Sequence, residues 1–140
     1  MTVQIMSRKE MEGLLNTDIL FGVDVISFSD MSEAECIDFK GLPERVFYVA
    51  VDDLDYDELE ERGLTEDSYF PEADELAQFI RESIEHNRDI ICQCEYGQSR
   101  SAGCAAAILE TVSGNGISIF SDYRYYPNKL IYNKLVERIR

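Results

Sequence analysis

Residues 90–103 read Ile90-Ile-Cys-Gln-Cys94-Glu-Tyr-Gly-Gln-Ser-Arg100-Ser-Ala-Gly103. The first part is a short apolar run of the kind that forms a buried strand. A glycine and several small polar residues then indicate a turn, and the alanine-rich segment after them indicates a helix. The sequence therefore predicts a strand, a tight loop and a helix in succession, and the rest of the chain is best interpreted around this unit.

The loop carries three chemically active residues, Cys94, Arg100 and Ser101. The N–H groups of such a loop, together with the N-terminus of the following helix, form a concave site for an anion. Arg100 adds a planar, two-pronged donor that suits the oxygens of a phosphoryl group. We expect a thiol in the floor of this site to be held as a thiolate by these dipoles and by the arginine. One loop thus predicts a nucleophile, an anion site and a group that stabilises a transition state.

Strand patterns alternate with helix patterns along the chain. Further strands are predicted at residues 2–6, 23–28 and 45–51. The last of these runs is strongly β-prone, and we expect it to be a central strand buried on both faces.

Helices are predicted from a capping box at Ser7 to about Asn16, from 68–71 to about 86–87, over 101–112, and from Pro127 onward. Residues 30–39 predict a loop with at most one helical turn, residues 52–65 a long acidic connection with room for a short helix, and residues 117–126 an irregular connection.

This alternation predicts an α/β fold. We expect a single domain over residues 1–140, with a central mixed, mostly parallel sheet flanked by helices. The phosphate-binding loop is expected between a central strand and a helix.

The composition excludes several classes of partner. The 28 acidic and 13 basic residues give a formal charge of −15, so nucleic acid is not an expected partner. No stretch approaches the length of a membrane span, so no membrane partner is expected either. The four cysteines show no disulfide framework and the N-terminus shows no cleavable leader, which indicates reduced thiols and a cytoplasmic protein. The sequence leaves the oligomeric state open.

The pattern Cys94-x-x-Gly97-x-Ser99-Arg100-Ser101 resembles the signature loop of the cysteine-dependent protein tyrosine phosphatases, most of all the dual-specificity branch with its small bacterial members. Three further segments resemble that branch. Residues 47–53 are similar to the strand that leads to its general-acid aspartate, residues 69–73 to the start of its next helix, and residues 126–128 to the start of a terminal helix. The resemblance covers residues 45–140 best.

This resemblance implies hydrolysis of a phosphomonoester through a phosphocysteine, with no metal or other cofactor. By it, Cys94 is the nucleophile, Arg100 holds the phosphoryl oxygens, Asp53 is the general acid, and Ser101 donates a hydrogen bond to the sulfur. The implied substrate-binding residues are those of the loop: Glu95, Tyr96, Gly97, Gln98, Ser99 and Arg100. The substrate is then a phosphorylated protein, carrying phosphotyrosine or phosphoserine/threonine, or a small phosphorylated metabolite.

Several alternatives stay open. Asp52 and Asp55 are rivals of Asp53 as the acid, because the acidic connection is unusually long. Gln93 stands where the family usually has histidine, so a phosphate-recognition module with weak or no turnover is the alternative function.

Residues outside the loop also carry open interpretations. Tyr123, Tyr125 and Tyr126 are either packing and surface residues or part of a pocket wall, and Arg124 and Lys129 either lie on the surface or assist anion binding. Cys36 or Cys104 is a candidate redox partner of Cys94.

Overall fold

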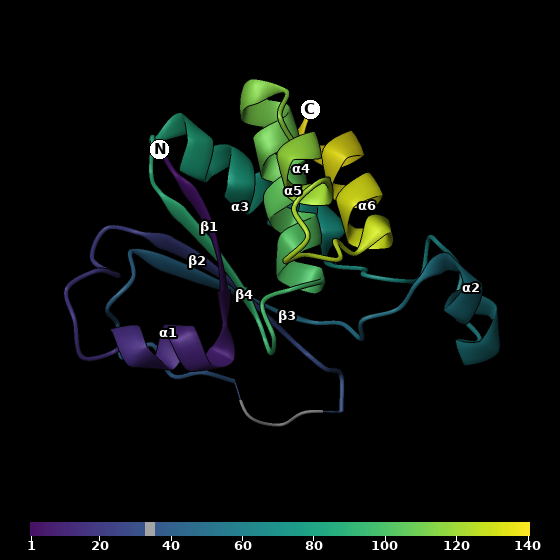
Figure 1. Ribbon diagram of the computed structural model, residues 1–140, viewed down its shortest axis with the longest axis horizontal. Coiled ribbons are helices and arrows are strands. Elements are labelled where there is room, and N and C mark those ends of the chain that lie inside the picture. Colours follow the sequence, from purple (N-terminus) through teal and green to yellow (C-terminus); the bar gives the residue numbers. More distant parts are fainter. Residues whose placement is uncertain (33–35) are drawn as a thin grey trace.

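The computed structural model describes residues 1–32 and 36–140 (Figure 1). Its strands are β1 (Val3–Ser7), β2 (Asp24–Ser29), β3 (Arg45–Ala50) and β4 (Ile90–Cys94). Its helices are α1 (Arg8–Leu14), α2 (Tyr56–Leu59), a 3-10 turn η1 (Glu60–Arg62), α3 (Ala73–Glu85), α4 (Arg100–Ser113), α5 (Ile117–Phe120) and α6 (Lys129–Ile139). None of the helices in this part of the chain is long and apolar enough to cross a membrane.

The four strands form one sheet in the order β1-β4-β2-β3, and each neighbouring pair is parallel. Cys92 of β4 is the register partner of Ile5 on one side and of Ile26 on the other, so β4 lies inside the sheet. This confirms the predicted α/β fold and places the strand before the loop in its interior.

The prediction that residues 45–51 form a central strand is wrong. β3 lies at the edge of the sheet, and Tyr48 and Ala50 on it are exposed. Its β-branched and aromatic residues favour a strand of any position, so local sequence does not distinguish an edge strand with a half-buried face from a central one.

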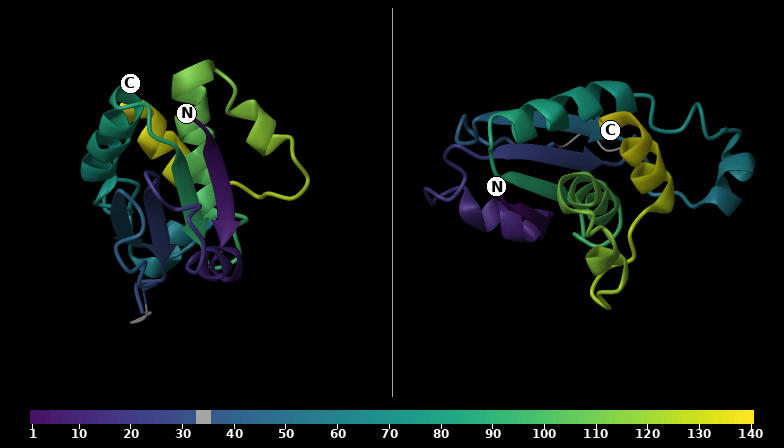
Figure 2. Two further views of the ribbon diagram at one scale, coloured as in Figure 1. Left: turned by 90° about the vertical axis from the view of Figure 1, so that its left-hand side faces the viewer. Right: turned by 90° about the horizontal axis from the view of Figure 1, so that it is seen from above.

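Helices cover both faces of the sheet. α3, α4 and α6 lie on one face and α1 lies on the other (Figures 1 and 2). The alternation of side chains along β4 follows this division, because Ile90 and Cys92 pack into the cluster under α3, α4 and α6, whereas Ile91 packs with Met11 of α1.

Short side chains let α4 and α6 approach closely. The alanine-rich half of α4 is buried, and a Cβ atom on Gly103 would collide with the backbone carbonyl of Asn128, the N-cap of α6. α4 ends as predicted at Gly114, which has φ +67°.

Three boundaries differ from the prediction. α3 begins at Ala73 rather than at 68–71, because Tyr69 and Phe70 are buried in the core and Phe70 has φ +59°, which no helix accommodates. Residues 117–120 form the short helix α5, and Pro127 precedes the last helix by two residues, since Asn128 is its cap. Part of the predicted loop at 30–39, residues 33–35, lies outside the described residues.

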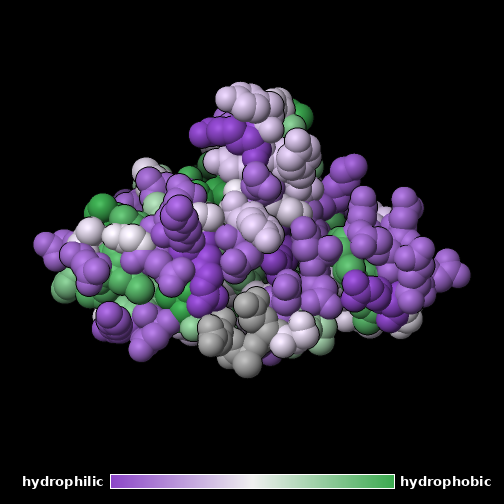
Figure 3. Space-filling model, turned by 60° about the horizontal axis from the view of Figure 1, so that its bottom comes forward, coloured by the Kyte–Doolittle hydropathy of each residue, from purple (hydrophilic) through white to green (hydrophobic). Residues whose placement is uncertain are grey.

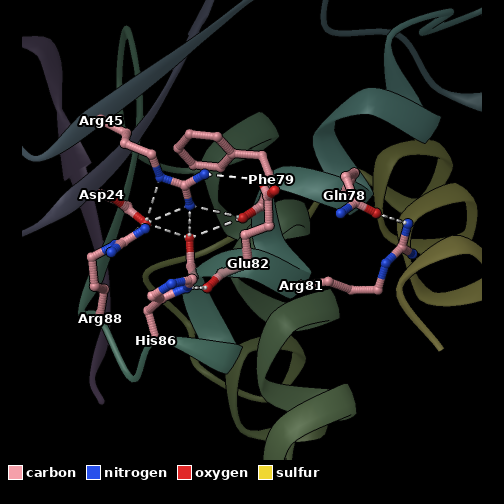
Figure 4. A network of polar contacts seen from close by, with 9 residues as sticks. Asp24, Arg45, Gln78, Phe79, Arg81, Glu82, His86 and Arg88 are labelled. Carbon is pink, nitrogen blue, oxygen red and sulfur yellow. Dashed lines mark hydrogen bonds and ion pairs between the residues drawn. The ribbon is translucent and has the colours of Figure 1, made fainter.

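A buried ionic network joins the amino ends of the strands (Figure 4). One carboxylate oxygen of Asp24 accepts hydrogen bonds from Arg45, Arg88 and Ser83, at 2.6 to 3.2 Å. Burial alone would raise the pKa of Asp24, but these hydrogen bonds outweigh it and hold the pKa below its usual range. Arg45 also lies 4.0 Å from the ring centroid of Phe79, so the network ties β2 and β3 to α3.

Candidate functional site

The candidate site forms at the carboxyl ends of three neighbouring parallel strands. Asp30 follows β2, Asp53 follows β3 by three residues, and the loop 95–99 follows β4. Ligands of parallel α/β sheets bind outside these ends, because the chain leaves each strand there in a loop. Residues far apart in the sequence therefore meet at the carboxyl end of the sheet.

The loop between β4 and α4 is tightly fixed to the rest of the protein. Gly97 has φ +67°, and a Cβ there would lie 2.7 Å from the backbone nitrogen of Ser7. Only glycine combines this backbone conformation with such a close approach. The carbonyl of Glu95 accepts a hydrogen bond of 3.1 Å from the N–H of Arg8, so β1 and α1 hold the loop from one side.

The loop presents its backbone N–H groups without partners. From Glu95 to Arg100, none of these groups donates a hydrogen bond within residues 1–32 and 36–140. α4 then begins at Arg100 and runs for 14 residues, so its positive end adds to the same region. Unpaired N–H groups at a helix N-terminus are typical of anion sites, so the arrangement is compatible with the predicted site, and anion binding itself stays a prediction.

Cys94 lies at the end of β4, under the loop, and is 3% exposed. Its sulfur is 3.0 Å from the hydroxyl oxygen of Ser101, in the first turn of α4. A hydroxyl at this distance can donate to a thiolate. The two residues therefore stand in the relation that the resemblance implies.

Arg100 is 6% exposed and is held at one end of its guanidinium group. Its Nη1 donates to Asp30 Oδ1 at 2.7 Å and to the carbonyl of Val51 at 3.0 Å. Its Nε is buried and has no hydrogen-bond partner in the described part of the chain. A buried unpaired N–H group costs about 1–3 kcal/mol, and an anion with suitably placed oxygens would remove that cost.

Asp53 is the aspartate that contacts the loop. Its Oδ1 accepts hydrogen bonds from Ser99 Oγ at 2.7 Å and from Asn128 Nδ2 at 2.9 Å. Its Oδ2 makes no hydrogen bond or ion pair with any described residue, so this oxygen is open to a further contact.

The two rival aspartates have other contacts. Asp52 accepts a hydrogen bond from the N–H of Met31 and lies 3.6 Å from Arg62. Asp55 is the N-cap of α2, where its carboxylate accepts from the N–H of Tyr56. Of the three aspartates, the structure brings only Asp53 to the loop.

Asn128 is a residue of the site that sequence reasoning missed. Its side-chain amide donates to Asp53, to the carbonyl of Leu54 and to the hydroxyl of Tyr69, at 2.9, 3.1 and 3.2 Å. Its Oδ1 caps α6 by accepting from the N–H of Ile131. An asparagine before a helical pattern signals a cap, but nothing local signals the three other contacts.

Two further residues of the site were also not predicted. Burial raises the pKa of Tyr69 to about 12, so its hydroxyl stays protonated and donates to the carbonyl of Asp52 at 2.6 Å. Asp30, the partner of Arg100, follows β2 much as Asp53 follows β3, and this shared position was the available signal.

Gln93 faces away from the loop. It points to the face of the sheet that carries α1, and its side-chain oxygen accepts a short hydrogen bond from the hydroxyl of Ser27, its register partner on β2. Gln93 is buried and uncharged. It therefore aligns the strand behind Cys94 without adding a positive charge to the site.

A pocket of about 430 Å³ lies beside the loop, on the side of Asp53. Its walls include Tyr125, Tyr126 and Lys129, which are three of the residues whose role the sequence left open. Tyr123 and Arg124 do not line this pocket; Tyr123 is exposed, and Arg124 forms an ion pair with Asp122 at 2.7 Å.

The other cysteines are unpaired. Burial, and then the contact with Cys92, raise the pKa of Cys104 well above its usual value, which makes its thiol a poor nucleophile. Cys36 is exposed. Within the described ranges, no three His, Cys, Asp or Glu side chains lie close enough together to hold a metal ion.

Several solved structures that share this arrangement of elements are described as phosphatases or as phosphatase-like. The Cydia pomonella PTP-2 phosphatase matches with a TM-score of 0.64 and 13% identity over 97% of this chain and 84% of that one. PTPMT1 in complex with PI(5)P matches with a TM-score of 0.59 and 15% identity, over 99% and 90%. The human tyrosine phosphatase-like serine/threonine/tyrosine-interacting protein matches with a TM-score of 0.60 and 16% identity, over 94% and 83%.

No protein-family model matches the chain, and no curated protein matches its sequence. The identities with the solved structures are too low to carry an activity across, but the shared fold is clear. The chain has the fold of the tyrosine and dual-specificity cysteine phosphatases, as the resemblance around Cys94 predicts.

Proposed function

We propose that this protein hydrolyses a phosphomonoester through a phosphocysteine at Cys94. The observation that carries the proposal is the buried, unpaired Nε of Arg100, which follows directly in the chain on a loop of unpaired N–H groups and on the buried Cys94. Buried donors without acceptors are rare in native proteins, and they indicate a ligand with acceptor oxygens. A phosphoryl group has three such oxygens.

In the first step, the thiolate of Cys94 attacks phosphorus, a sulfur–phosphorus bond forms, and the bond from phosphorus to the leaving oxygen breaks. Arg100 and the loop N–H groups donate to the three equatorial oxygens, where charge is spread in the transition state. Because they supply the positive field themselves, the mechanism needs no metal ion.

Asp53 acts as the general acid in this step. Ser99 and Asn128 donate to its Oδ1, which fixes the carboxyl group and leaves Oδ2 to deliver the proton to the leaving oxygen. The carboxylate then accepts a proton from a water molecule that attacks phosphorus, and phosphate leaves as the sulfur–phosphorus bond breaks. Ser101 donates to the departing sulfur in this second step.

The substrate is a phosphorylated protein or a small phosphorylated molecule. One structural neighbour was solved with a phosphoinositide, so the fold accepts small phosphorylated ligands in that protein. The proposed location is the cytoplasm, where thiols stay reduced.

A recognition module without turnover is the second candidate, and two observations favour it. Gln93 contributes no positive charge behind the nucleophile, and one structural neighbour is described as phosphatase-like and interacting. Both candidates bind a phosphorylated ligand, so only turnover separates them.

The deciding experiment measures release of phosphate from p-nitrophenyl phosphate and from a phosphotyrosine peptide. We expect the wild-type protein to turn over both, the Cys94→Ser variant to turn over neither, and a Cys36→Ser control, which removes an exposed thiol, to match the wild type. After an acid quench, mass spectrometry should find the phosphoryl group on the peptide that contains Cys94. A wild-type protein that binds the peptide without turnover is a recognition module, and the proposal is then wrong.

The role of Asp53 is tested by how strongly the rate of hydrolysis in an Asp53 variant depends on the leaving group. The Asp53→Asn substitution should slow hydrolysis of the phosphotyrosine peptide by roughly 10²-fold, the usual scale for general acid catalysis. It should slow hydrolysis of p-nitrophenyl phosphate far less, because that leaving group hardly needs a proton. Asp52→Asn is the matched control. A leaving-group dependence that changes in the control and not in Asp53→Asn would assign the acid to Asp52.

A further inference from the structure

The pocket beside Asp53 has a composition that a phosphate site does not explain. Three acidic residues line it, Asp53, Asp55 and Glu58, against one basic residue, Lys129. None of the three carboxylates forms an ion pair with a Lys or Arg of the described chain. A phosphoryl group would be repelled here, so the pocket suits a different, cationic part of a ligand.

The pocket is joined to the phosphate site through shared residues. Asp53 and Ser99 line it and also contact each other at the edge of the loop, whereas Cys94 and Arg100 do not line it. The N–H of Tyr126 donates to the carbonyl of Gln98 at 2.8 Å, which fixes one pocket wall to the loop. A group in the pocket therefore lies next to a phosphoryl group held by Arg100, whose unpaired Nε independently marks the ligand site.

Aromatic rings form the rest of the wall. Phe120, Tyr125 and Tyr126 line the pocket, and Tyr126 is 73% exposed. Phe120 is fixed by an edge-to-face contact with Tyr132, with ring centroids 4.9 Å apart. Aromatic faces beside carboxylates bind guanidinium groups well, because the planar cation stacks on the ring while its N–H groups pair with the carboxylate.

The acidic segment around the pocket also favours a cationic ligand. The arm that carries α2 projects from the body of the protein, and its surface is hydrophilic (Figures 1 and 3). Its acidic residues are Asp55, Asp57, Glu58, Glu60, Glu61, Glu66 and Asp67. Such a surface attracts a basic ligand over about one Debye length and repels ligands with several phosphates.

We propose that this pocket binds the side chain of an arginine that neighbours the phosphorylated residue, so that the substrate is a basic phosphopeptide segment of a protein. The inference rests on the proposed function and names its substrate class. Asp55 and Glu58 pair with the guanidinium group, and Tyr126 stacks on it. A multiply phosphorylated inositol or nucleotide fits this surface poorly, because its further phosphates would face the carboxylates.

The test compares two short phosphotyrosine peptides that differ only in carrying arginine or glutamine on both sides of the phosphotyrosine. The informative variant is Asp55→Asn/Glu58→Gln, because it removes two charges and keeps the caps of α2: asparagine is a good N-cap, and glutamine serves in a capping box. Asp57→Asn/Glu61→Gln is the matched control, since it removes two charges of the same arm outside the pocket.

We expect the wild type to prefer the arginine peptide about tenfold in kcat/KM, the scale of a stacked and partly desolvated ion pair. The pocket variant should lose most of this preference, the control should keep it, and added salt should reduce it. The same preference should appear when binding of both peptides to the Cys94→Ser protein is measured by fluorescence anisotropy. Equal kcat/KM and equal binding for the two peptides would overturn the inference, as would an inositol phosphate that binds more tightly than the arginine peptide. Because binding is measured without turnover, an inactive wild type that still prefers arginine would refute the proposed hydrolysis and leave the arginine pocket standing.

Discussion

Asn128 should be the residue on which the site depends most for its shape, and Asn128→Asp tests this directly. The substitution keeps the volume of the side chain and the oxygen that caps α6, because aspartate caps helices as well as asparagine does. It replaces the amide group that donates to Asp53, Leu54 and Tyr69 by an oxygen that accepts. Two acceptors then face each other at Asp53 and at the Leu54 carbonyl.

Leaving a buried polar group without its partner costs about 1–3 kcal/mol, so the loss of these contacts should destabilise the protein by about 3 kcal/mol in total. That is a large part of the 5–15 kcal/mol typical of a folded domain and corresponds to a melting temperature lower by roughly 10 °C. Urea denaturation followed by circular dichroism measures the loss in free energy of unfolding. Asn16→Asp makes the same chemical change at an exposed position and should stay within about 0.5 kcal/mol of the wild type.

The exchange variant Asp53→Asn/Asn128→Asp adds a sharper criterion. It restores a donor opposite an acceptor, so it should be about 1 kcal/mol more stable than Asn128→Asp, while hydrolysis of the phosphotyrosine peptide stays slow because the proposed acid is absent. If Asn128→Asp is as stable as Asn16→Asp, or if the exchange recovers nothing, then Asn128 does not hold Asp53 in place.

The other predictions concern the nucleophile, the arginine and the ionic network. Arg100→Lys should lower kcat for p-nitrophenyl phosphate by about 10²–10³, because a lysine cannot donate in the two-pronged geometry; a loss within threefold would contradict this. Iodoacetate should label Cys94 faster than Cys92 and Cys104, although all three thiols are buried, as mapped by mass spectrometry, and equal rates would argue against an activated thiolate. Because the pKa of Asp24 is lowered by folding, its stabilisation is fully present above the unfolded pKa of about 3.9 and is lost as the pH falls through the lower folded value. The wild type should therefore exceed Asp24→Asn in free energy of unfolding, measured by urea denaturation, by an amount that shrinks as the pH falls below about 4. A difference that does not change with pH would contradict this.

The parts of the site that the sequence predicted are local in the chain. The strand, glycine turn and helix around Cys94 are fixed by contacts within about ten residues, so periodicity and turn chemistry reveal them. The same holds for the cap of α1 at Ser7, where side chains three residues apart bond each other.

The parts that were missed depend on contacts between distant segments. Asn128 meets Asp53 across 75 positions and Arg100 meets Asp30 across 70, and no local pattern records such a pairing. Strand order is equally non-local: β3 is an edge strand because it pairs with β2 alone, whereas β4 lies between β1 and β2, and the Val-rich run at 45–51 does not encode this order. The choice of Asp53 from position alone agrees with the structure only in that Asp53 contacts the loop; its role stays a prediction.

The ionic network and the loop 95–99 occupy opposite ends of the same strands. Asp24 and Arg45 begin β2 and β3, and a strand of six residues separates them from Asp30 and Val51 by about 17–20 Å. Substitutions that are this far apart and share no partner usually have additive effects on stability. A library that randomises residues around the pocket should consequently show little epistasis with substitutions in the network. Variants stabilised at the amino end of the sheet would then serve as a common background for substitutions that test the proposed site at the carboxyl end.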